Sequence, residues 1–359
     1  QTYNDYKLVA DVSNRFLGNR FGIVGQIDTE KRNRSSNELG ANYWINGPSL
    51  VDTNIVLVSS LGLRDITRIN NRLNGLFVLD ANIPNGNISL TNLYSRIDKD
   101  EIVHSNSYGI VQDSRSFGTS DIQRTLTVAT NSLLYEQQFS GFKVDAFLTH
   151  SFSGSVTPRT LSWNFNEPNA FKNPDLNAAP EDVPSFARND TLDAFLTGVN
   201  MDSSANKETE ISRGVNVEFD FNFSRRVSAK IKLGNKYRTK RRYYDRFRRF
   251  SPLAWGSWQN ARDTILKTYP EMQEWSSLGT QFLSLLGFMD YNYQPVNFLD
   301  GNYELGPVSD VSLLSGVYEL LLPHDVMRND FSASLLNDYS GNEEYGARYM
   351  MVDLKIGSR

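Results

Sequence analysis

The residue types that most often carry out chemistry are scattered along this chain. Its three histidines, His104, His150 and His324, have no HExxH or similar spacing that would build a metal site. The sequence also has no G-x-S-x-G nucleophile turn, no phosphate-binding P-loop and no G-x-G-x-x-G fingerprint. Carboxylates such as Glu343 and Glu344 would suit a glycosidase site, but acidic clusters in loops are usually solvated. The sequence therefore predicts a protein that is not an enzyme and that uses no cofactor.

One group of side chains suits ligand binding by stacking. Five aromatic residues fall between positions 239 and 346 and could stack on a sugar or another flat ligand: Trp255, Trp258, Trp275, Tyr291 and Tyr293. The favoured alternative is that they form the small apolar core of a folded loop, because aromatic side chains dominate such cores.

A second candidate is the most basic run of the chain, "KYRTKRRYYDRFRRF", at positions 236–250. It contains Arg241 and Arg242, and arginine matches a phosphate group with two parallel hydrogen bonds. The run could therefore attract an anionic ligand or the phosphates of lipopolysaccharide. The favoured alternative is that these side chains face water or pair with nearby carboxylates.

The elements that position these residues are predicted to be β-strands. In "GVNVEFDFNFSRRVSAKIKLG", positions 214–234, apolar and polar residues alternate with the period of two that is typical of strands. The polar residues around Arg225 predict a tight turn. A hairpin folded there sets Asp220 opposite Lys230 and Glu218 opposite Lys232, with apolar residues on the other face.

The same pattern recurs along the chain and predicts an all-β, antiparallel fold of about nine strands. Short turns are expected near positions 14–19, 84–87, 138–141 and 224–226, and a last strand begins at Arg348. Long links are expected at positions 29–71, 98–122, 153–209 and 239–346. Compact soluble domains seldom carry structureless loops beyond ~12–15 residues. Alternation of short turns with long loops is typical of outer-membrane barrels.

The longest link, 239–346, is expected to fold as a partly helical extracellular loop. "SWQNARDTILKTYPEMQEW" suits a helix with Ser257 as its cap. Its apolar side would carry Ile265, Leu266, Tyr269 and Met272. The segments "LGTQFLSLLGFM" and "VSDVSLLSGVYELLL" are also predicted to be helical.

Composition narrows the function further. A net charge of -4 provides no basic excess for nucleic-acid binding. No apolar run approaches the ~18–20 residues of a membrane helix, so any crossing of a membrane must use strands. The chain has no cysteine, which excludes disulfides and thiol nucleophiles and disfavours a zinc site. Its first residues, "QTYNDYKLVADV", have no signal-peptide character, and we expect the chain to be part of a longer polypeptide.

Several segments resemble TonB-dependent outer-membrane receptors, and the resemblance covers most of the chain: "NRFGIVGQIDTEKRNRSSNELGANYW", "RLNGLFVLDANIPNGNISLTNLYSRID", "GVNVEFDFNFSRRVSAKIKLGNKYRTKRR" and "NDYSGNEEYGARYMMVDLKIGSR". The resemblance implies that residues 1–359 supply about nine strands of a transmembrane β-barrel of roughly 22 strands. It places the chain among the lipids of the outer membrane of a Gram-negative cell. It also implies a plug, outside this segment, that engages TonB.

The activity implied by the resemblance is active import of a scarce ligand that extracellular loops recognise. The ligand could be a metal chelate, an oligosaccharide or a peptide, and a surface lipoprotein is a possible partner. A passive porin would be a variant without a plug. The alternative from another class is a non-transporting, β-rich surface adhesin or carbohydrate-binding protein.

Overall fold

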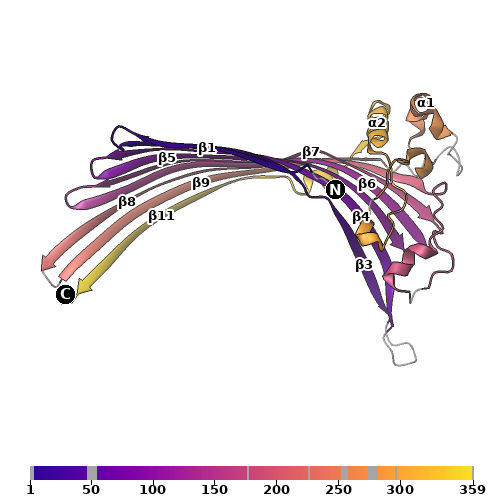
Figure 1. Cartoon of the computed structure of the whole chain (residues 1–359), viewed down its shortest axis with the longest axis horizontal. Coiled ribbons are helices and arrows are strands. Elements are labelled where there is room, and N and C mark those ends of the chain that lie inside the picture. The colour runs from indigo at the N-terminus through magenta and orange to yellow at the C-terminus, as the bar shows by residue number, and fades with distance from the viewer. Residues whose placement is uncertain are drawn as a thin grey trace.

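The computed structural model describes residues 4–46, 55–175, 178–224, 227–251, 258–273, 282–295 and 297–357. Most of them form one antiparallel sheet that arches along its length, with hairpin turns and the C-terminus at one end and the helices at the other (Figure 1). This confirms the prediction of an all-β, antiparallel chain. The sheet is open, because β1 and β11 lie at opposite edges and do not pair with each other.

The strands follow one another across the sheet in nearly the order of the sequence: β1 (Tyr6–Phe16), β2 (Phe21–Asn33), β3 (Ser36–Asn46), β4 (Ile55–Ile83), β5 (Gly86–Gly109), β6 (Ser114–Gln138), β7 (Phe142–Pro168), β8 (Phe195–Ser224), β9 (Val227–Ser251), β10 (Arg328–Asn329) and β11 (Tyr339–Ile356). Since β2 and β3 pair with successive halves of β4, they act as one interrupted strand. With the two-residue β10 set aside, nine strand positions remain, as the sequence predicts.

The register of the β8–β9 hairpin agrees with the prediction. Asp220 lies opposite Lys230, and Glu218 lies opposite Lys232. The shorter ion pair is diagonal, with Lys230 Nζ 2.7 Å from Glu218 Oε1, whereas the direct pair of Lys230 with Asp220 is 3.9 Å long. The tip of this hairpin, residues 225–226, is outside the described residues. The other three predicted turns separate β1 from β2, β4 from β5 and β6 from β7.

The long links were wrongly predicted as loops. The strands β4 to β9 are 24 to 30 residues long and fill much of the sequence assigned to links. Positions 98–122 belong mainly to β5 and β6, which join at residues 110–113. Likewise, the 239–346 loop is shorter than predicted, since β9 continues to Ser251 and β11 begins at Tyr339. Backbone pairing continues there although simple alternation fades, because pairing uses main-chain groups whatever the side chains are.

Residues directly opposite each other point to the same face of a sheet, so the register defines two faces. One, which we call the banded face, carries Val215, Leu233, Met350 and their direct partners. Near the hairpin turns its residues form an apolar band: Leu8, Val12 and Phe16; Phe21, Ile23 and Ile27; Leu73, Phe77 and Leu79; Ile88, Leu90 and Tyr94; Leu133 and Tyr135; Val144, Ala146, Leu148 and Phe152; Val215, Val217, Phe219, Phe221 and Phe223; Ile231 and Leu233; Met350, Val352, Leu354 and Ile356. Many of these side chains are exposed, and no second sheet or helix covers the band within the described ranges.

The band is staggered across the sheet. On β1 the band ends at Leu8, and on β4 it ends at Leu73. These two residues lie in one row of directly opposite residues across the sheet, and this row meets β8 at Lys207. On β8 itself the continuous apolar run ends earlier, at Val215, and a single exposed Ile211 follows beyond Arg213. The other end of the band, next to the hairpin turns, shifts in the same direction. The row of residues opposite Phe16, the last residue of β1, meets β8 at Val215, and β8 continues nine residues further to Ser224. Both limits move by about eight or nine residues, a stagger that tilted strands produce.

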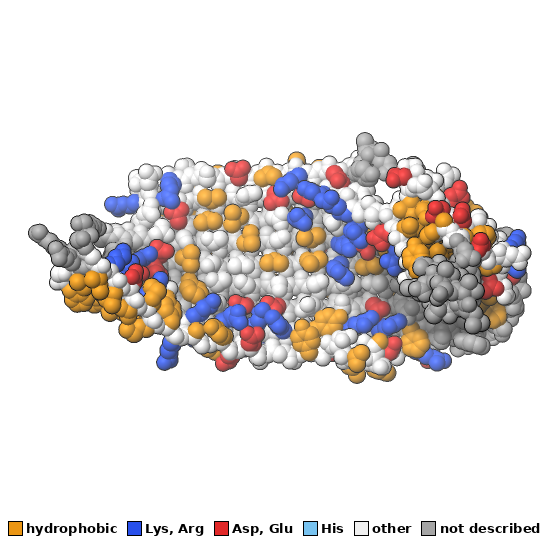
Figure 2. Space-filling view, turned by 90° about the horizontal axis from the view of Figure 1, so that it is seen from below, with side chains coloured by type: hydrophobic (Ala, Val, Ile, Leu, Met, Phe, Trp, Pro, Cys, Tyr) orange, Lys and Arg blue, Asp and Glu red, His pale blue; other side chains and the backbone are white. Residues whose placement is uncertain are grey.

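The other face, the polar face, carries a series of ion pairs. Lys240 Nζ lies 2.7 Å from Glu208, Lys99 Nζ lies 2.6 Å from Glu101, and Lys143 lies 3.1 Å from Asp145. Because α1 and α2 lie above the sheet in Figure 1 and pack on the banded face, the underside of the arch is the polar face. Seen from below, it shows Lys and Arg next to Asp and Glu among mostly uncharged side chains (Figure 2).

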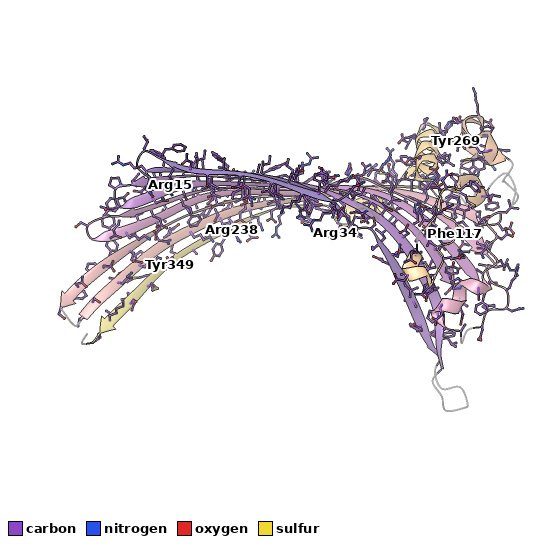
Figure 3. All side chains as sticks on the ribbon, in the orientation of Figure 1. Arg15, Arg34, Phe117, Arg238, Tyr269 and Tyr349 are labelled. Atoms are coloured by element: carbon purple, nitrogen blue, oxygen red, sulfur yellow. The ribbon has the colours of Figure 1, made fainter. Side chains whose placement is uncertain are left out.

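At the end of the arch away from the turns, the insertion between β9 and β11 covers the banded face. Its helices α1 (Gln259–Thr268) and α2 (Val311–Leu321) pack on Phe117, Leu161 and Trp163 of the sheet. Phe117 on the sheet and Tyr269 on the insertion lie at this same end (Figure 3). A second core joins Leu61 and Leu63 of β4 to the rest of the insertion.

The predicted helices are largely confirmed. In and after α1, Ile265 and Met272 are buried, and Leu266 and Tyr269 pack beside them, as the sequence predicts. In the second segment, residues 278–281 are outside the described part, and the prediction of a helix is wrong for the rest, which contains a 3-10 turn, η4 (Leu285–Phe288), and no α-helix. The α2 helix begins after Asp310, whose carboxylate accepts from two backbone N–H groups. The cap predicted at Ser257 also lies outside the described residues.

Candidate ligand-binding site

The predicted aromatic residues do not form one site. Trp255 and Trp275 lie outside the described residues. Trp258 is only 1% exposed and packs in the core beneath the helices, which confirms the apolar-core alternative for this residue. Tyr291 is exposed, and its hydroxyl donates to the backbone carbonyl of Leu286 at 3.3 Å. Tyr293 alone of these three described residues lines a pocket.

The predicted basic pair, Arg241 and Arg242, lies on opposite faces of β9. Arg242 is on the polar face, where its Nε donates to Glu208 at 2.8 Å. Arg241 is exposed on the banded face and makes no ion pair with any residue that the structure describes. Neither arginine lines the pocket of Tyr293.

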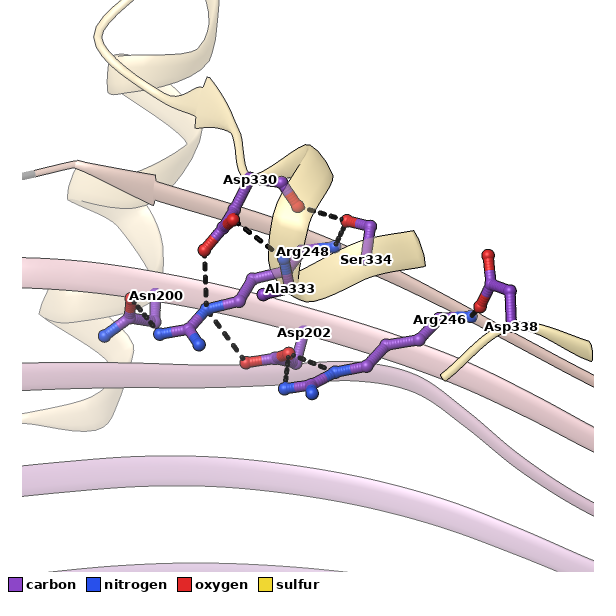
Figure 4. A network of polar contacts seen from close by, with 8 residues as sticks. All are labelled: Asn200, Asp202, Arg246, Arg248, Asp330, Ala333, Ser334 and Asp338. Carbon is purple, nitrogen blue, oxygen red and sulfur yellow. Dashed lines mark hydrogen bonds and ion pairs between the residues drawn. The ribbon is translucent and has the colours of Figure 1, made fainter. Parts of the chain in front are cut away.

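Further along the basic run, the cations are used within the protein. Asp202 on β8 accepts from Arg246 Nε at 3.0 Å, and Arg248 Nη2 donates to Asn200 at 2.9 Å (Figure 4). The backbone N–H groups of Arg246 and Arg248 donate to Asp338 and to Ser334 in α3 (Phe331–Leu335). These bonds hold the end of the insertion against β9, so the favoured alternative of paired cations is confirmed for this part of the run.

The pocket that contains Tyr293 has a volume of about 630 Å³. It lies on the banded face, beyond the band, between the interrupted strand β2–β3, β4 and the segment 293–298. Its walls are mainly amides and hydroxyls, with Tyr293 and Phe298 on the insertion side: Asn4, Lys31, Asn33, Ser35, Ser36, Asn37, Asp65, Thr67, Ile69, Tyr293, Gln294, Pro295 and Phe298.

The interruption between β2 and β3 shapes one wall of the pocket. Ser35 takes the place of a ladder residue, since its Oγ accepts the backbone N–H of Arg68 at 3.1 Å. Asn33 Oδ1 accepts the N–H of Ser35 at 2.8 Å. Short polar side chains of this kind bond to the nearby backbone and so stabilise a break in a regular strand.

Asp65 fixes the orientation of Tyr293. The Tyr293 hydroxyl donates to Asp65 Oδ2, and Asn37 Nδ2 donates to Asp65 Oδ1 at 2.8 Å. The side-chain oxygen Oδ1 of Asn37 in turn accepts the backbone N–H of Leu299 at 3.4 Å. Burial, followed by the bond to Asp65, raises the pKa of Tyr293 above its ordinary value. The phenol is therefore neutral at physiological pH and acts as the donor to Asp65.

His104 supports Tyr293 from behind. The two rings meet edge to face with their centroids 5.3 Å apart, and His104 Nδ1 lies 3.2 Å from Thr119 Oγ1. Burial lowers the pKa of His104, and the charges of Asp65 and Asp290 partly oppose this shift. Since a histidine has an ordinary pKa of 6.5, His104 is neutral at pH 7.

A buried arginine anchors the loops that flank this site. Arg115 is fully buried, donates to Asn106 Oδ1 at 2.8 Å, and lies over the rings of Tyr108 and Phe117. Its cross-strand partner, Glu167, accepts the N–H of Asp190 at 2.9 Å, and burial raises the pKa of this carboxyl. These contacts connect the 169–194 loop to the sheet.

The groups left free in the pocket define the ligands that it suits. Two amides, two hydroxyls and an ammonium have no hydrogen bond or ion pair to another described side chain: Asn4, Gln294, Ser36, Thr67 and Lys31. Together with the ring of Tyr293 they suit a hydroxylated ligand, with polar contacts to its hydroxyls and stacking on its flat side. Among the described residues, no cluster of three His, Asp or Glu side chains could hold a metal ion.

The sequence pointed to one residue of this pocket, Tyr293. The others were missed because β3 was predicted to be part of a long link, and because the contacts between positions 37, 65 and 293 depend on docking of the insertion. The cluster of short polar residues at positions 33–37 is the one local signal that could have indicated the interruption.

Comparisons with family models, with curated proteins and with solved structures return no match for this chain. In the described part of the chain, no helix has both the length and the apolar character needed to cross a membrane.

Proposed function

We propose that this chain forms part of the wall of an outer-membrane β-barrel receptor that imports a scarce ligand. In this proposal the band faces lipid, the polar face lines a hydrated lumen, and the insertion and long strand ends stand outside the cell. Import is driven through TonB and a plug that is not part of this segment. The observation that carries the proposal is the exposed, staggered apolar band.

The length of the band supports this assignment. Its stretches are 7 to 9 residues long on seven of the nine strand positions, near the ~9–11 residues with which a tilted strand crosses a bilayer, and three residues long on β6 and β9. Beyond it, the same face becomes polar, with Arg96 and Asp98 on β5. A soluble sheet has no reason to confine exposed apolar residues to a band of this width. Lys and Glu on the opposite face suit a water-filled lumen.

The stagger supports the same assignment. Strands of outer-membrane barrels tilt by ~35–45°. A shift of about 1.4 residues per strand, with ~3.3 Å per residue and ~4.8 Å between strands, corresponds to a tilt of about 45°. The limits of the band therefore follow the line along which a flat bilayer would cut tilted strands.

Residues 1–359 contain no cysteine, so single cysteines introduced here provide a clean test in a full-length protein whose other cysteines are replaced by serine. We expect Val217→Cys and Leu133→Cys to resist a membrane-impermeant maleimide in intact cells. Cysteines at Glu210 and Ser151, on the polar face, should react once the lumen is accessible. Equal labelling on both faces would contradict a membrane position for the band.

Transport needs its own test. In cells that produce the full-length protein, uptake of candidate oligosaccharides, peptides or metal chelates should stop when the proton gradient is collapsed, while surface binding continues. Uptake that persists without the gradient would indicate a passive pore and remove the role of TonB.

One observation favours a second candidate function. The pocket of Tyr293 lies on the banded face rather than on the polar face, so in the proposed barrel it is on the outer side of the wall. A pocket there suits capture of a hydroxylated ligand at the cell surface by a carbohydrate-binding protein that does not transport. Binding that requires Tyr293, together with no uptake under any condition, would support this alternative.

A further inference from the structure

A shallow groove of about 350 Å³ crosses β6, β7 and β8 within the band. Leu133, Ala146, Leu148 and Val215 line it, and Ala146 is the small residue among larger neighbours. Pockets of roughly 300 Å³ and above are large enough to hold a small ligand. The groove is apolar along most of its length, but Arg213 and Asn235 stand at one end.

The polar end of the groove contains one cation, Arg213, and a second cation, Arg348, lies beside it on β11; neither has an acidic partner among the described residues. Arg213 on β8 and Arg348 on β11 are both exposed on the banded face, each just past the end of the band on its strand. The guanidinium of Arg213 lies over the ring of Tyr237 at 5.2 Å, which directs it towards β9. Arg348 lies opposite Asn235. Neither arginine forms an ion pair with a residue in the described ranges.

On the other face of the same strands, neighbouring cations of the basic run are paired. On the polar face of β9, Arg238, Lys240 and Arg242 all have acidic partners within 2.8 Å. On the banded face, β11 offers one acidic side chain, Glu344, which lies opposite Thr239 and pairs with no described cation. Arg241, four residues after Tyr237 on β9, points to this same face and is, among the described residues, a third unpaired cation.

A cationic pair at the end of an apolar groove matches an amphiphile with an anionic head. Arginine binds phosphate with two parallel charge-assisted hydrogen bonds, and the lipid-side position of the groove suits an acyl chain. We propose that Arg213, Arg348 and Asn235 bind the phosphate of a phosphorylated lipid of the outer leaflet, with one acyl chain in the groove. This proposal rests on the proposed membrane position of the band.

The test uses the full-length protein purified in a non-ionic detergent, with native mass spectrometry as the measurement. The probes are lipid A, a phosphorylated and acylated disaccharide, the same lipid after dephosphorylation, and inorganic phosphate. We expect lipid A to bind, and the double variant Arg213→Gln, Arg348→Gln to weaken its binding at least about tenfold. The variant Ala146→Trp, which fills the groove, should also reduce binding.

Lys236→Gln is the matched control, because it removes an exposed cation from the polar face of β9, the strand between the two arginines, and should leave lipid binding unchanged. Each variant is first checked for a native β-sheet circular dichroism spectrum. Equal binding of the dephosphorylated lipid, or unchanged binding by the double variant, would overturn the proposal. Competition by inorganic phosphate at the concentration of the lipid would assign the site to free phosphate instead.

These outcomes are separate from those of the proposed function. If the protein does not import any ligand but still prefers phosphorylated lipid, the proposal of import is rejected and the lipid site is kept. If the cysteine labelling agrees with a membrane position for the band but the protein shows no preference for phosphorylated lipid, the lipid site is rejected and the barrel is kept.

Discussion

Tyr293 shows how one side chain of the insertion connects with the sheet. It was singled out from the sequence as an aromatic residue that could stack on a ligand, and the structure places it at a pocket. Its hydroxyl is bonded to Asp65 and its edge contacts His104. The residue therefore has two roles that can be separated, one in docking the segment 293–298 and one in presenting an aromatic surface.

Replacing Tyr293 by Phe keeps the ring and removes the donor to Asp65. A hydrogen bond to a charged group contributes ~1.5–3 kcal/mol, so we expect the local opening free energy of segment 290–299 to fall by an amount in this range. Hydrogen exchange followed by mass spectrometry measures this opening. Tyr291→Phe, which removes an exposed hydroxyl, is the control and should change it by less than about 0.5 kcal/mol. Equal effects of the two variants would contradict the anchoring role of Asp65.

His104 gives the same contact a defined pH dependence. Its pKa is lowered in the folded protein, mainly by burial. When the segment opens, the imidazole takes up a proton more readily, so stability of the docked state is present above the ordinary pKa of 6.5 and is lost as the pH falls through it. We expect the protection factors of the 290–299 segment, which correct for the intrinsic pH dependence of amide exchange, to be lower at pH 5.5 than at pH 7.5. His104→Gln should flatten this dependence, and an unchanged slope in the variant would assign it to another group.

At the scale of strands, the two faces of the β8–β9 hairpin should tolerate charge differently. Phe219 lies in the band, whereas Ser228 lies on the polar face. An arginine that faces the middle of a bilayer costs ~2–4 kcal/mol, whereas lumen positions are tolerant. We therefore expect Phe219→Arg to lower the free energy of unfolding by about this amount in lipid vesicles, and Ser228→Arg to have a small effect. Similar losses at both positions would argue that the two faces meet the same solvent.

The strands also show what the sequence can and cannot predict. The β8–β9 register followed from alternation and a polar turn, because both signals are local. The outer halves of β4 to β7 were missed, since Leu61, Leu63 and Trp163 there are buried by an insertion that comes from distant positions. The α1 and α2 helices were found because each has an apolar side with helical spacing. The pocket combines three segments that are far apart in sequence, and no local pattern encodes their meeting.

At the scale of the whole molecule, the open sheet leaves two long edges without partners. The outer edges of β1 and β11 do not pair with any other strand that the structure describes. Unpaired edges invite pairing with other chains. We expect the isolated 359-residue chain to associate through these edges when refolded in detergent.

Spin labels on cysteines introduced at Lys7 of β1 and Asp353 of β11 would measure this association. Labels near the edges of different molecules should approach within the range of dipolar coupling, and a label in the middle of the sheet, at Ser132, should not. A chain that stays monomeric at all concentrations would show that its edges are protected.

The strands that continue beyond the band raise the pocket well above the proposed lipid surface. On β4 the band ends at Leu73 and the pocket begins at Ile69, so at ~3.3 Å per residue the two are separated by roughly 13 Å of tilted strand. The Debye length in physiological salt is ~8 Å. Counter-ions therefore weaken the field of the lipid headgroups by the time it reaches the pocket. A ligand without net charge should be held there with the same affinity in dilute and in saline surroundings, whatever lipids lie beneath.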